Sequence, residues 1–114
     1  MELKYFKPTE FKMGTEIVFD KMNSQFLEKL DTLRYLCGIP LKINSSYRTE
    51  DYNKSVKGAK NSMHLEGRAV DIACINSTTR AIILKNALAM GLSCGVYKTW
   101  IHVDDRDKQI VYHG

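Results

Sequence analysis

The spacing of hydrophobic residues predicts a helix that begins at Asn23 or Ser24 and ends at Cys37. Apolar side chains recur at helical intervals in this stretch and form one face, made of Phe26, Leu27, Leu30, Leu33 and Cys37. Either Asn23 or Ser24 can accept a hydrogen bond from the first turn, and the run Gly38-Ile39-Pro40 ends the helix.

A second helix is predicted over residues 78–90, with Ser77 as its N-terminal cap and Gly91 just after its end. Its expected buried stripe consists of Ala81, Leu84, Ala87, Leu88 and Gly91. Two other stretches carry no clear period. Residues 1–22 are expected to be irregular, and residues 47–61 to form a short helix or an ordered loop.

Shorter stretches with alternating or uniformly apolar residues predict strands. They cover residues 41–45, 68–75, 93–97 and 100–104, and residues 109–112 are expected to add an edge strand. Two main helices and several short strands, the last of them adjacent in sequence, predict an α+β fold. In this fold a small, mainly antiparallel sheet is flanked by the two helices.

Composition fits one globular domain over residues 1–114, because 44% of the residues are hydrophobic and 26% are charged. We expect a monomer.

The net charge of +4 is compatible with an anionic cell wall, but the chain lacks the dense Lys and Arg clusters of a nucleic-acid-binding protein. No apolar stretch is long enough for membrane insertion and the N-terminus lacks signal-peptide features, so a cytoplasmic location after synthesis is expected. The widely spaced Cys37, Cys74 and Cys94 are expected to be reduced, buried thiols.

Three polar residues stand out against this apolar pattern. Asp71 lies within an apolar predicted strand, where an unpaired carboxylate would be costly. His64 precedes it by seven residues, and His102 lies within another predicted strand. Two imidazoles and one carboxylate from different segments are typical of a catalytic zinc site, which leaves a fourth position open. The alternative is structural: Asp71 pairs with Arg68, and the histidines only form hydrogen bonds.

Three sequence blocks carry a resemblance to the M15 zinc peptidases. Residues 61–71 (NSMHLEGRAVD) resemble the family motif S-x-H-x-x-G-x-A-x-D, Ser46-Tyr47-Arg48 resembles its upstream S-x-Y-R, and residues 101–104 (IHVD) resemble its downstream block. Gly95-Val96-Tyr97 fits the short, phage- and prophage-associated branch. The resemblance covers about residues 6–104 and implies a fold like that of hedgehog domains and D-Ala-D-Ala peptidases.

The same resemblance implies one zinc ion per chain, held by His64, Asp71 and His102. It also implies that Arg48 lies near the metal and binds a carboxylate or carbonyl oxygen of the substrate, in keeping with the two-donor geometry of guanidinium. The alternative for Arg48 is a surface salt bridge with Glu50 or Asp51. Further substrate-binding residues are expected to be Ser62, Tyr97 and Trp100. Each has a plainer alternative: Ser62 could cap a turn, and the two aromatic residues could simply pack.

The sequence motifs identify the general base of the reaction less clearly than they identify the metal ligands. Relatives often place a histidine two residues before the last ligand or a glutamate three residues before it, and here those positions hold Trp100 and Thr99. Asp104 lies two residues beyond His102 on the same strand face, so we expect it to act as the catalytic base. Its alternative role is to orient His102. Glu66 and Asp105 are weaker candidates for the base.

Together these features predict a zinc metallopeptidase, a carboxypeptidase or endopeptidase, that cleaves peptidoglycan stem peptides. A phage or prophage lysis enzyme (endolysin) that reaches the cell wall with help from a holin fits this prediction, and a phage-particle component that softens the wall during entry would share the chemistry. The alternative is a non-catalytic, hedgehog-like zinc module that binds a wall fragment or a protein partner. The cleaved bond, D-Ala-D-Ala or L-Ala-D-Glu, stays open, and two histidines with one aspartate can also bind other divalent ions.

Overall fold

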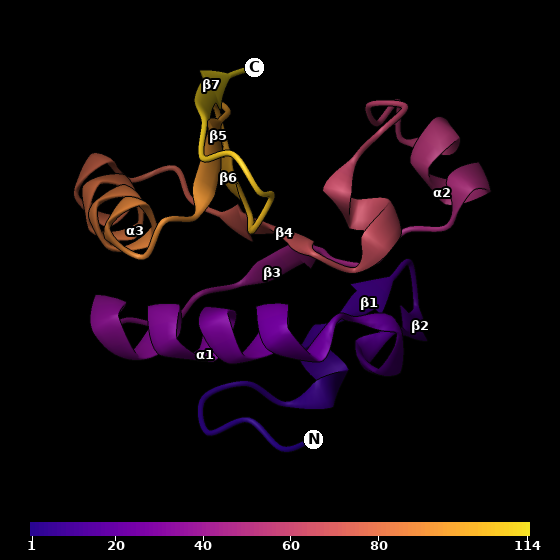
Figure 1. The fold of residues 1–114 in the computed structure, drawn as a ribbon, viewed down its shortest axis with the longest axis horizontal. Coiled ribbons are helices and arrows are strands. Elements are labelled where there is room, and N and C mark those ends of the chain that lie inside the picture. Colours follow the sequence, from indigo (N-terminus) through magenta and orange to yellow (C-terminus); the bar gives the residue numbers. More distant parts are fainter.

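A five-stranded sheet forms the centre of the structure, a computed structural model that describes residues 1–114 (Figure 1). The strands lie in the order β3-β4-β6-β5-β7, and neighbours are antiparallel except for the parallel pair β5 and β7. Their bounds are β3 Ile43–Ser45, β4 Ala69–Ala73, β5 Ser93–Val96, β6 Trp100–Asp104 and β7 Val111–His113. The predicted α+β class with a mainly antiparallel sheet is therefore confirmed.

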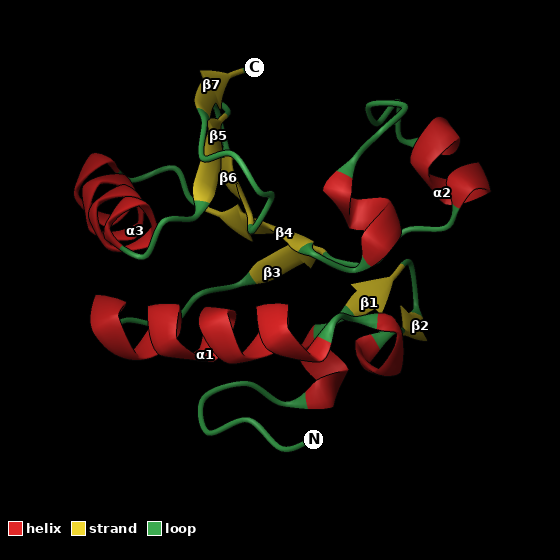
Figure 2. Cartoon of the chain, viewed as in Figure 1, coloured by secondary structure: helices red, strands yellow, loops and turns green.

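Helix α1 (Ser24–Cys37) forms as its hydrophobic pattern predicts. Asn23 caps it, since its side chain accepts a hydrogen bond from the Phe26 backbone N–H at 2.9 Å. Its buried residues are the predicted ones, namely Phe26, Leu27, Leu30, Leu33 and Cys37. In Figures 1 and 2, α1 runs below the sheet and α3 (Ser77–Ala89) lies to its left, whereas the short α2 (Glu50–Ser55) lies to its right.

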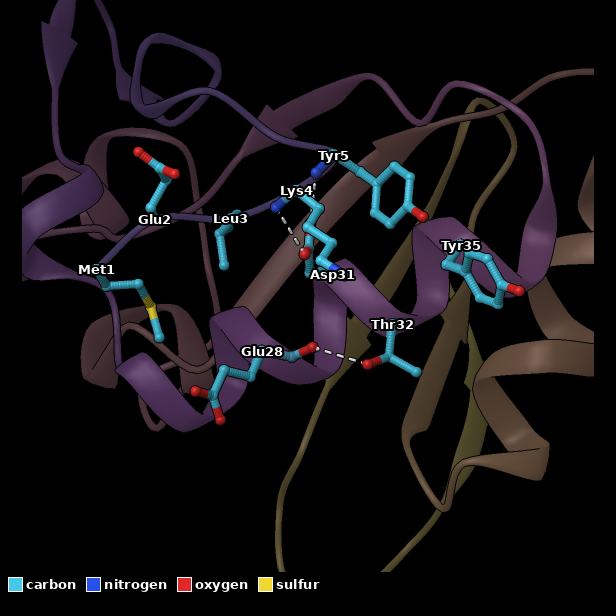
Figure 3. Close-up of a pocket in the computed structure, with 9 residues that line it drawn as sticks. All are labelled: Met1, Glu2, Leu3, Lys4, Tyr5, Glu28, Asp31, Thr32 and Tyr35. Carbon is cyan, nitrogen blue, oxygen red and sulfur yellow. Dashed lines mark hydrogen bonds between the residues drawn. The ribbon is translucent and has the colours of Figure 1, made fainter.

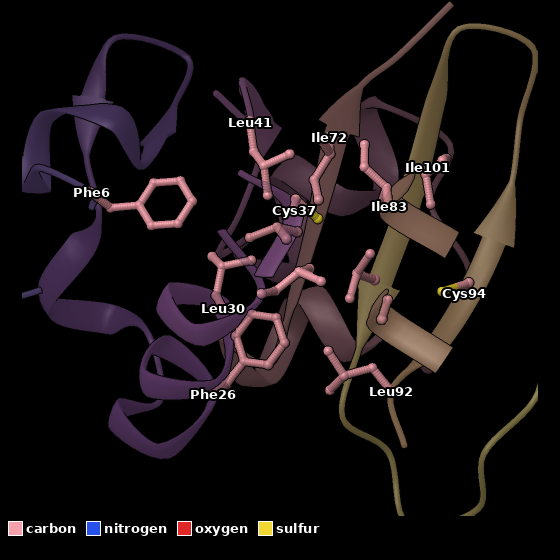
Figure 4. Close-up of a cluster of buried hydrophobic side chains, with 14 of the residues drawn as sticks. Phe6, Phe26, Leu30, Cys37, Leu41, Ile72, Ile83, Leu92, Cys94 and Ile101 are labelled. Carbon is pink, nitrogen blue, oxygen red and sulfur yellow. The ribbon is translucent and has the colours of Figure 1, made fainter. Parts of the chain in front are cut away.

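The hydrophobic core fills the space between α1, α3 and one face of the sheet (Figure 4). From the strands it receives Val70, Ile72, Cys94, Ile101 and Val103, all at most 5% exposed. Full burial of a Leu, Ile, Phe or Val side chain contributes about 1.5–3 kcal/mol, so this layer supplies most of the driving force that holds the sheet against the helices. The three cysteines are free and buried, as expected.

Alternation along β4 and β6 sends the intervening residues to the opposite face of the sheet. Val70 and Ile72 point into the core, so Asp71 between them points away from it, and His102 does the same between Ile101 and Val103. The two polar side chains are nevertheless buried, which shows that other segments cover them.

The predicted details of α3 need two corrections. Its cap is Asn76, whose side chain accepts from the Thr79 N–H, rather than Ser77. Its buried residues are Ile83 and Ala87, whereas the expected Ala81 and Gly91 are exposed. Because residues 81–84 are all apolar, the spacing alone does not decide which face of this helix turns inward.

Residues 1–22, expected to be irregular, contain four short elements instead. They are η1 Pro8–Glu10, β1 Lys12–Met13, β2 Glu16–Ile17 and η2 Phe19–Lys21, and β1 and β2 pair as a separate hairpin. Elements of two or three residues are too short to show a hydrophobic period, which is why the sequence does not reveal them. None of the helices combines the length and the apolar character that crossing a membrane requires.

Candidate metal centre

A row of residues crosses the sheet on the face opposite the core. Strand register pairs Ser45 with Asp71, Asp71 with His102, His102 with Gly95, and Gly95 with Tyr112. Directly opposed residues share a face of the sheet and lie about 5 Å apart. The sheet therefore places Asp71 and His102 side by side although they are far apart in sequence.

His64 reaches the same place from η3 (Met63–Glu66), the short helix just before β4. Ser62 caps this turn by accepting a hydrogen bond from the His64 N–H at 3.1 Å. Gly67 then turns the chain into β4 with a φ of 68°, and a Cβ here would lie 2.5 Å from the Lys21 carbonyl oxygen. Only glycine fits this close approach in a left-handed conformation, so Gly67 fixes the path that delivers His64.

The three side chains converge on one point. The Asp71 Oδ1 atom lies 3.1 Å from His64 Nε2 and 3.1 Å from His102 Nδ1. One ligand atom from each residue lies within 4.8 Å of the others, and all three residues are buried. This is the trio that the sequence predicts as metal ligands.

The second nitrogen of each imidazole shows which ring nitrogen carries a proton and which one is free to bind a cation. His64 Nδ1 lies 2.7 Å from the Ser46 carbonyl oxygen, and His102 Nε2 lies 2.7 Å from Asp104 Oδ2. A carbonyl and a carboxylate can only accept, so both nitrogens must carry protons. In a neutral ring the other nitrogen then presents a lone pair, and two such lone pairs face the Asp71 carboxylate. A divalent cation between these three donors satisfies all of them, and the donor set suits zinc.

The charges around these groups favour a cation at this point of the site. Burial would raise the pKa of Asp71, but hydrogen bonds with His102 and His64 outweigh it and hold the pKa below its ordinary value. Burial would lower the pKa of His102, but Asp104 and Asp71 raise it above its ordinary value. The ionised carboxylates thus favour positive charge at this point, which a second proton on the His102 ring supplies in the free chain and a metal cation supplies when one is bound.

Arg48 completes the inner part of this site. Its Nη2 atom donates to Asp71 Oδ2 at 3.1 Å, and its Nε atom donates to Ser45 Oγ at 3.0 Å. The side chain is 12% exposed, and its ion pair is with Asp71 rather than with Glu50 or Asp51. Arg68, the partner considered for Asp71 from the sequence, pairs with Asp105 at 2.7 Å instead.

A cleft of about 310 Å³ opens onto the three converging side chains. The predicted substrate-binding residues Arg48, Ser62, Tyr97 and Trp100 all line it. The rings of Tyr97 and Trp100 stack with centroids 4.4 Å apart and an interplanar angle of 8°. The other lining residues, which the sequence did not single out for the cleft, are Val56, Lys57, Gly58, Ala59 and Tyr112.

Comparison with known families supports this assignment. A family model described as Peptidase M15 matches residues 4–104. The chain belongs to the M15 peptidase family. No curated protein matches the chain. This membership confirms the resemblance carried by the three sequence blocks and shows that the chain is a peptidase-family domain. M15 peptidases are metal-dependent hydrolases. In this M15 chain the buried trio His64, Asp71 and His102 could hold the metal ion.

Asp104 lies at the edge of this M15 site, with its carboxylate enclosed. Its side chain is 0% exposed, and Arg106 binds it through Nη2 at 2.6 Å and through Nε at 2.9 Å. His102 Nε2 occupies the remaining approach to Oδ2. Asp104 is absent from the cleft lining. No motif marks Arg106, which binds the Asp104 carboxylate because the turn after β6 folds it back onto that residue.

Asn53 is another residue that sequence reasoning missed. It is 3% exposed, and its Oδ1 atom accepts from Arg48 Nη1 at 3.1 Å while its Nδ2 atom donates to the Ala59 carbonyl at 2.8 Å. The Gly58 N–H donates to the Asn53 carbonyl at 2.8 Å. Asn53 therefore fastens the loop that forms one wall of the cleft to the guanidinium of Arg48.

Replacing the buried Asn53 with alanine is expected to lower the free energy of unfolding by about 1–3 kcal/mol, because the Ala59 carbonyl and the Arg48 guanidinium each lose a partner. The measurement is urea denaturation of the purified chain. Asn61→Ala is the matched control, since Asn61 is exposed in the same loop. Equal stability of the two variants would contradict the fastening role of Asn53.

The largest cavity lies elsewhere, beside the N-terminus and the outer face of α1 (Figure 3). It measures about 570 Å³ and lies between residues 1–5 and the α1 side chains Glu28, Asp31, Thr32 and Tyr35. Asp31 accepts from the backbone N–H groups of Lys4 and Tyr5, at 2.9 Å each. These bonds fix the N-terminal segment on α1, and the cavity contains none of the converging metal-ligand side chains.

Proposed function

We propose that this chain is a zinc-dependent peptidase that cleaves peptide bonds in peptidoglycan stem peptides. The observation that carries the proposal is the convergence of His64 Nε2, Asp71 Oδ1 and His102 Nδ1 at a cleft in a chain of the M15 family. Three protein ligands with an open side are the arrangement of catalytic, rather than structural, zinc sites.

The three residues would hold one zinc ion per chain. When bound, zinc supplies a Lewis acid that polarises a carbonyl and activates water for attack at neutral pH. The protein fixes the ligands through their second nitrogens: the Ser46 carbonyl holds the His64 ring, and Asp104 holds the His102 ring. Zinc is favoured over oxygen-preferring cations because two of the three donors are imidazoles.

Arg48 is proposed to bind the substrate in the catalytic site. A guanidinium carries five N–H donors, and hydrogen bonds to Ser45, Asn53 and Asp71 use three of them. The remaining two are available where Arg48 lines the cleft, and they suit a carboxylate or a developing oxyanion. Lys57 adds a second cation to the cleft lining. Stem peptides carry several carboxylates, which is the substrate chemistry that these two cations favour.

The other predicted substrate-binding residues are proposed to contribute to the cleft in two different ways. The stacked rings of Tyr97 and Trp100 are proposed to form an apolar wall against the peptide. The Ser62 hydroxyl already accepts from the His64 N–H, and we propose that it holds the first ligand in place while it lines the cleft.

Of the two roles that the sequence leaves open for Asp104, the geometry supports orientation of His102. Both carboxylate oxygens accept hydrogen bonds from Arg106, and one of them also contacts His102. A carboxylate that is 0% exposed and outside the cleft lining is poorly placed to take a proton from water. We propose that Asp104 is a positioning residue for the imidazole rather than the general base.

The cellular setting is proposed from the resemblance to the short phage and prophage branch. A monomeric lysis enzyme, synthesised in the cytoplasm and reaching the wall with the help of a holin, fits a small chain with a peptidoglycan-directed site. The net charge of +4 favours contact with an anionic wall.

A second candidate function is a non-catalytic zinc module that binds a wall fragment. The observation that favours it is the composition of the cleft: apart from the three candidate ligands, no residue that lines it is a histidine, aspartate or glutamate. The usual general bases are therefore absent from the cleft wall.

Digestion of purified peptidoglycan distinguishes the two candidates. The zinc-loaded chain is incubated with peptidoglycan beside a chelator-treated sample and a sample with zinc restored, and products are identified by mass spectrometry. Products that disappear with chelator and return with zinc support the peptidase, and their masses name the bond. An undigested substrate, with one zinc still bound per chain, would favour the binding module.

A further inference from the structure

Tyr112 lies beside the candidate metal centre although it belongs to the C-terminal strand β7. The family match ends at residue 104, so this strand lies outside the segment that the family model describes. The Tyr112 and His102 rings are nevertheless 5.9 Å apart at an interplanar angle of 50°. Residues beyond the shared segment therefore form part of the cleft.

Gly95 is what allows this approach. It is the register partner of both His102 and Tyr112, so a side chain at this position would point to the same face as His102. A Cβ on Gly95 would lie 2.5 Å from the Tyr112 Cε2 atom and 2.7 Å from its hydroxyl oxygen. Side-chain atoms do not come this close. Because position 95 has no side chain, the tyrosine ring lies across β5 and extends towards β6.

The ring is held in this position from several sides. Its edge meets the Tyr97 ring at an angle of 90°, with centroids 6.2 Å apart. The Arg106 guanidinium lies 5.7 Å from the ring centroid, and Asp104 fixes that guanidinium in turn. Tyr112 is thus an ordered wall of the cleft rather than a loose C-terminal side chain.

We propose that Tyr112 is a specificity-determining residue whose ring limits the size of the substrate group bound beside His102. With Tyr97 and Trp100 it gives the cleft lining three aromatic rings, and Arg48 and Lys57 give it two cations. A cleft of about 310 Å³ is at the small end for a ligand site, so little room is left next to this ring. The substrate class is a peptide that directs a carboxylate to Arg48 and Lys57 and a methyl-sized side chain to Tyr112. The peptide substrate rests on the proposed function.

The test compares two synthetic peptides by calorimetry on the zinc-loaded chain. One is N-acetyl-L-Ala-D-Glu-L-Lys-D-Ala-D-Ala, and the other carries D-Leu in place of both D-Ala residues. The wild type is expected to bind the D-Ala peptide more tightly than the D-Leu peptide, and the ratio of the two dissociation constants is the preference ratio. Tyr112→Ala opens a small apolar pocket and is expected to reduce this ratio by about tenfold. Tyr112→Phe keeps the ring and is expected to keep the ratio. Gly95→Ala displaces the ring and is expected to reduce the ratio as Tyr112→Ala does.

Val111→Ala is the control, because Val111 is 58% exposed on the same strand and is absent from the cleft lining. Zinc content and a thermal melt check each variant, and Tyr112→Leu replaces Tyr112→Ala if that variant does not hold zinc. An unchanged ratio in the ring-removing variants would overturn the proposal, and so would loss of preference in Tyr112→Phe or failure of the wild type to bind either peptide. Binding with the expected ratios but without cleavage would leave the role of Tyr112 intact and reject the peptidase activity.

Discussion

Replacing Asp71 with asparagine is expected to abolish zinc binding and peptide hydrolysis together. Loss of a residue that merely supports a ligand costs about 10–100-fold in metal affinity, so loss of a ligand's charge should cost more than about 100-fold. The variant should also unfold more easily, by about 3–5 kcal/mol, because the nearly buried Arg48 guanidinium loses its ionic partner. Zinc content after dialysis, peptidoglycan digestion and urea denaturation measure the three effects.

Asp107→Asn is the control for this prediction. It removes the same charge from a fully exposed side chain, 106% exposed, that only approaches Arg68 at 4.0 Å. Its zinc content, activity and stability should match the wild type. An Asp71→Asn chain that retained stoichiometric zinc would contradict the assignment of Asp71 as a ligand.

Replacing Asp104 with asparagine is expected to weaken zinc binding by about 10–100-fold, because His102 then loses the carboxylate that fixes its orientation and raises its basicity. A general base would give a different result: activity would fall while zinc affinity stayed unchanged. The measurement is competition for zinc with a chelating dye, carried out beside peptidoglycan digestion at saturating zinc.

Asp105→Asn is the matched control for Asp104. Asp105 is the next residue, its side chain is 6% exposed, and it forms ion pairs with Arg68 and Lys29 without touching a histidine. It should lose some stability and keep its zinc affinity. If both variants bound zinc as the wild type does, Asp104 would not be the residue that orients His102.

The sequence predicts the elements whose hydrophobic residues form one clear stripe. Helix α1 and strand β6 appear where the pattern places them, and the buried face of α1 consists of the expected side chains. Helix α3 has apolar residues on several faces, so its inward residues, Ile83 and Ala87, follow from packing against α1 and β5. Parallel pairing of β7 with β5 depends on how the chain crosses over after β6, which local spacing does not encode.

The candidate ligands could be named from the sequence because their spacing follows a family motif. The residues that surround and hold these ligands could not be named from the sequence. Arg106 encloses Asp104 from the loop after β6, and Asn53 in helix α2 fastens Arg48, which lies in the loop before that helix. Tyr112 reaches the cleft only because the sheet places it beside a glycine in the neighbouring strand. Such roles depend on which segments the fold brings together, so they emerge only from the three-dimensional structure.

X-ray absorption at the zinc edge, recorded on the zinc-loaded chain, tests the central claim most directly. The structure predicts two imidazole nitrogens and carboxylate oxygen at about 2.0–2.2 Å, with a fourth light ligand from solvent. His102→Ala should reduce the imidazole contribution from two rings to one or abolish binding. Sulfur at about 2.3 Å, or fewer than two imidazoles in the wild type, would contradict a centre built from His64, Asp71 and His102.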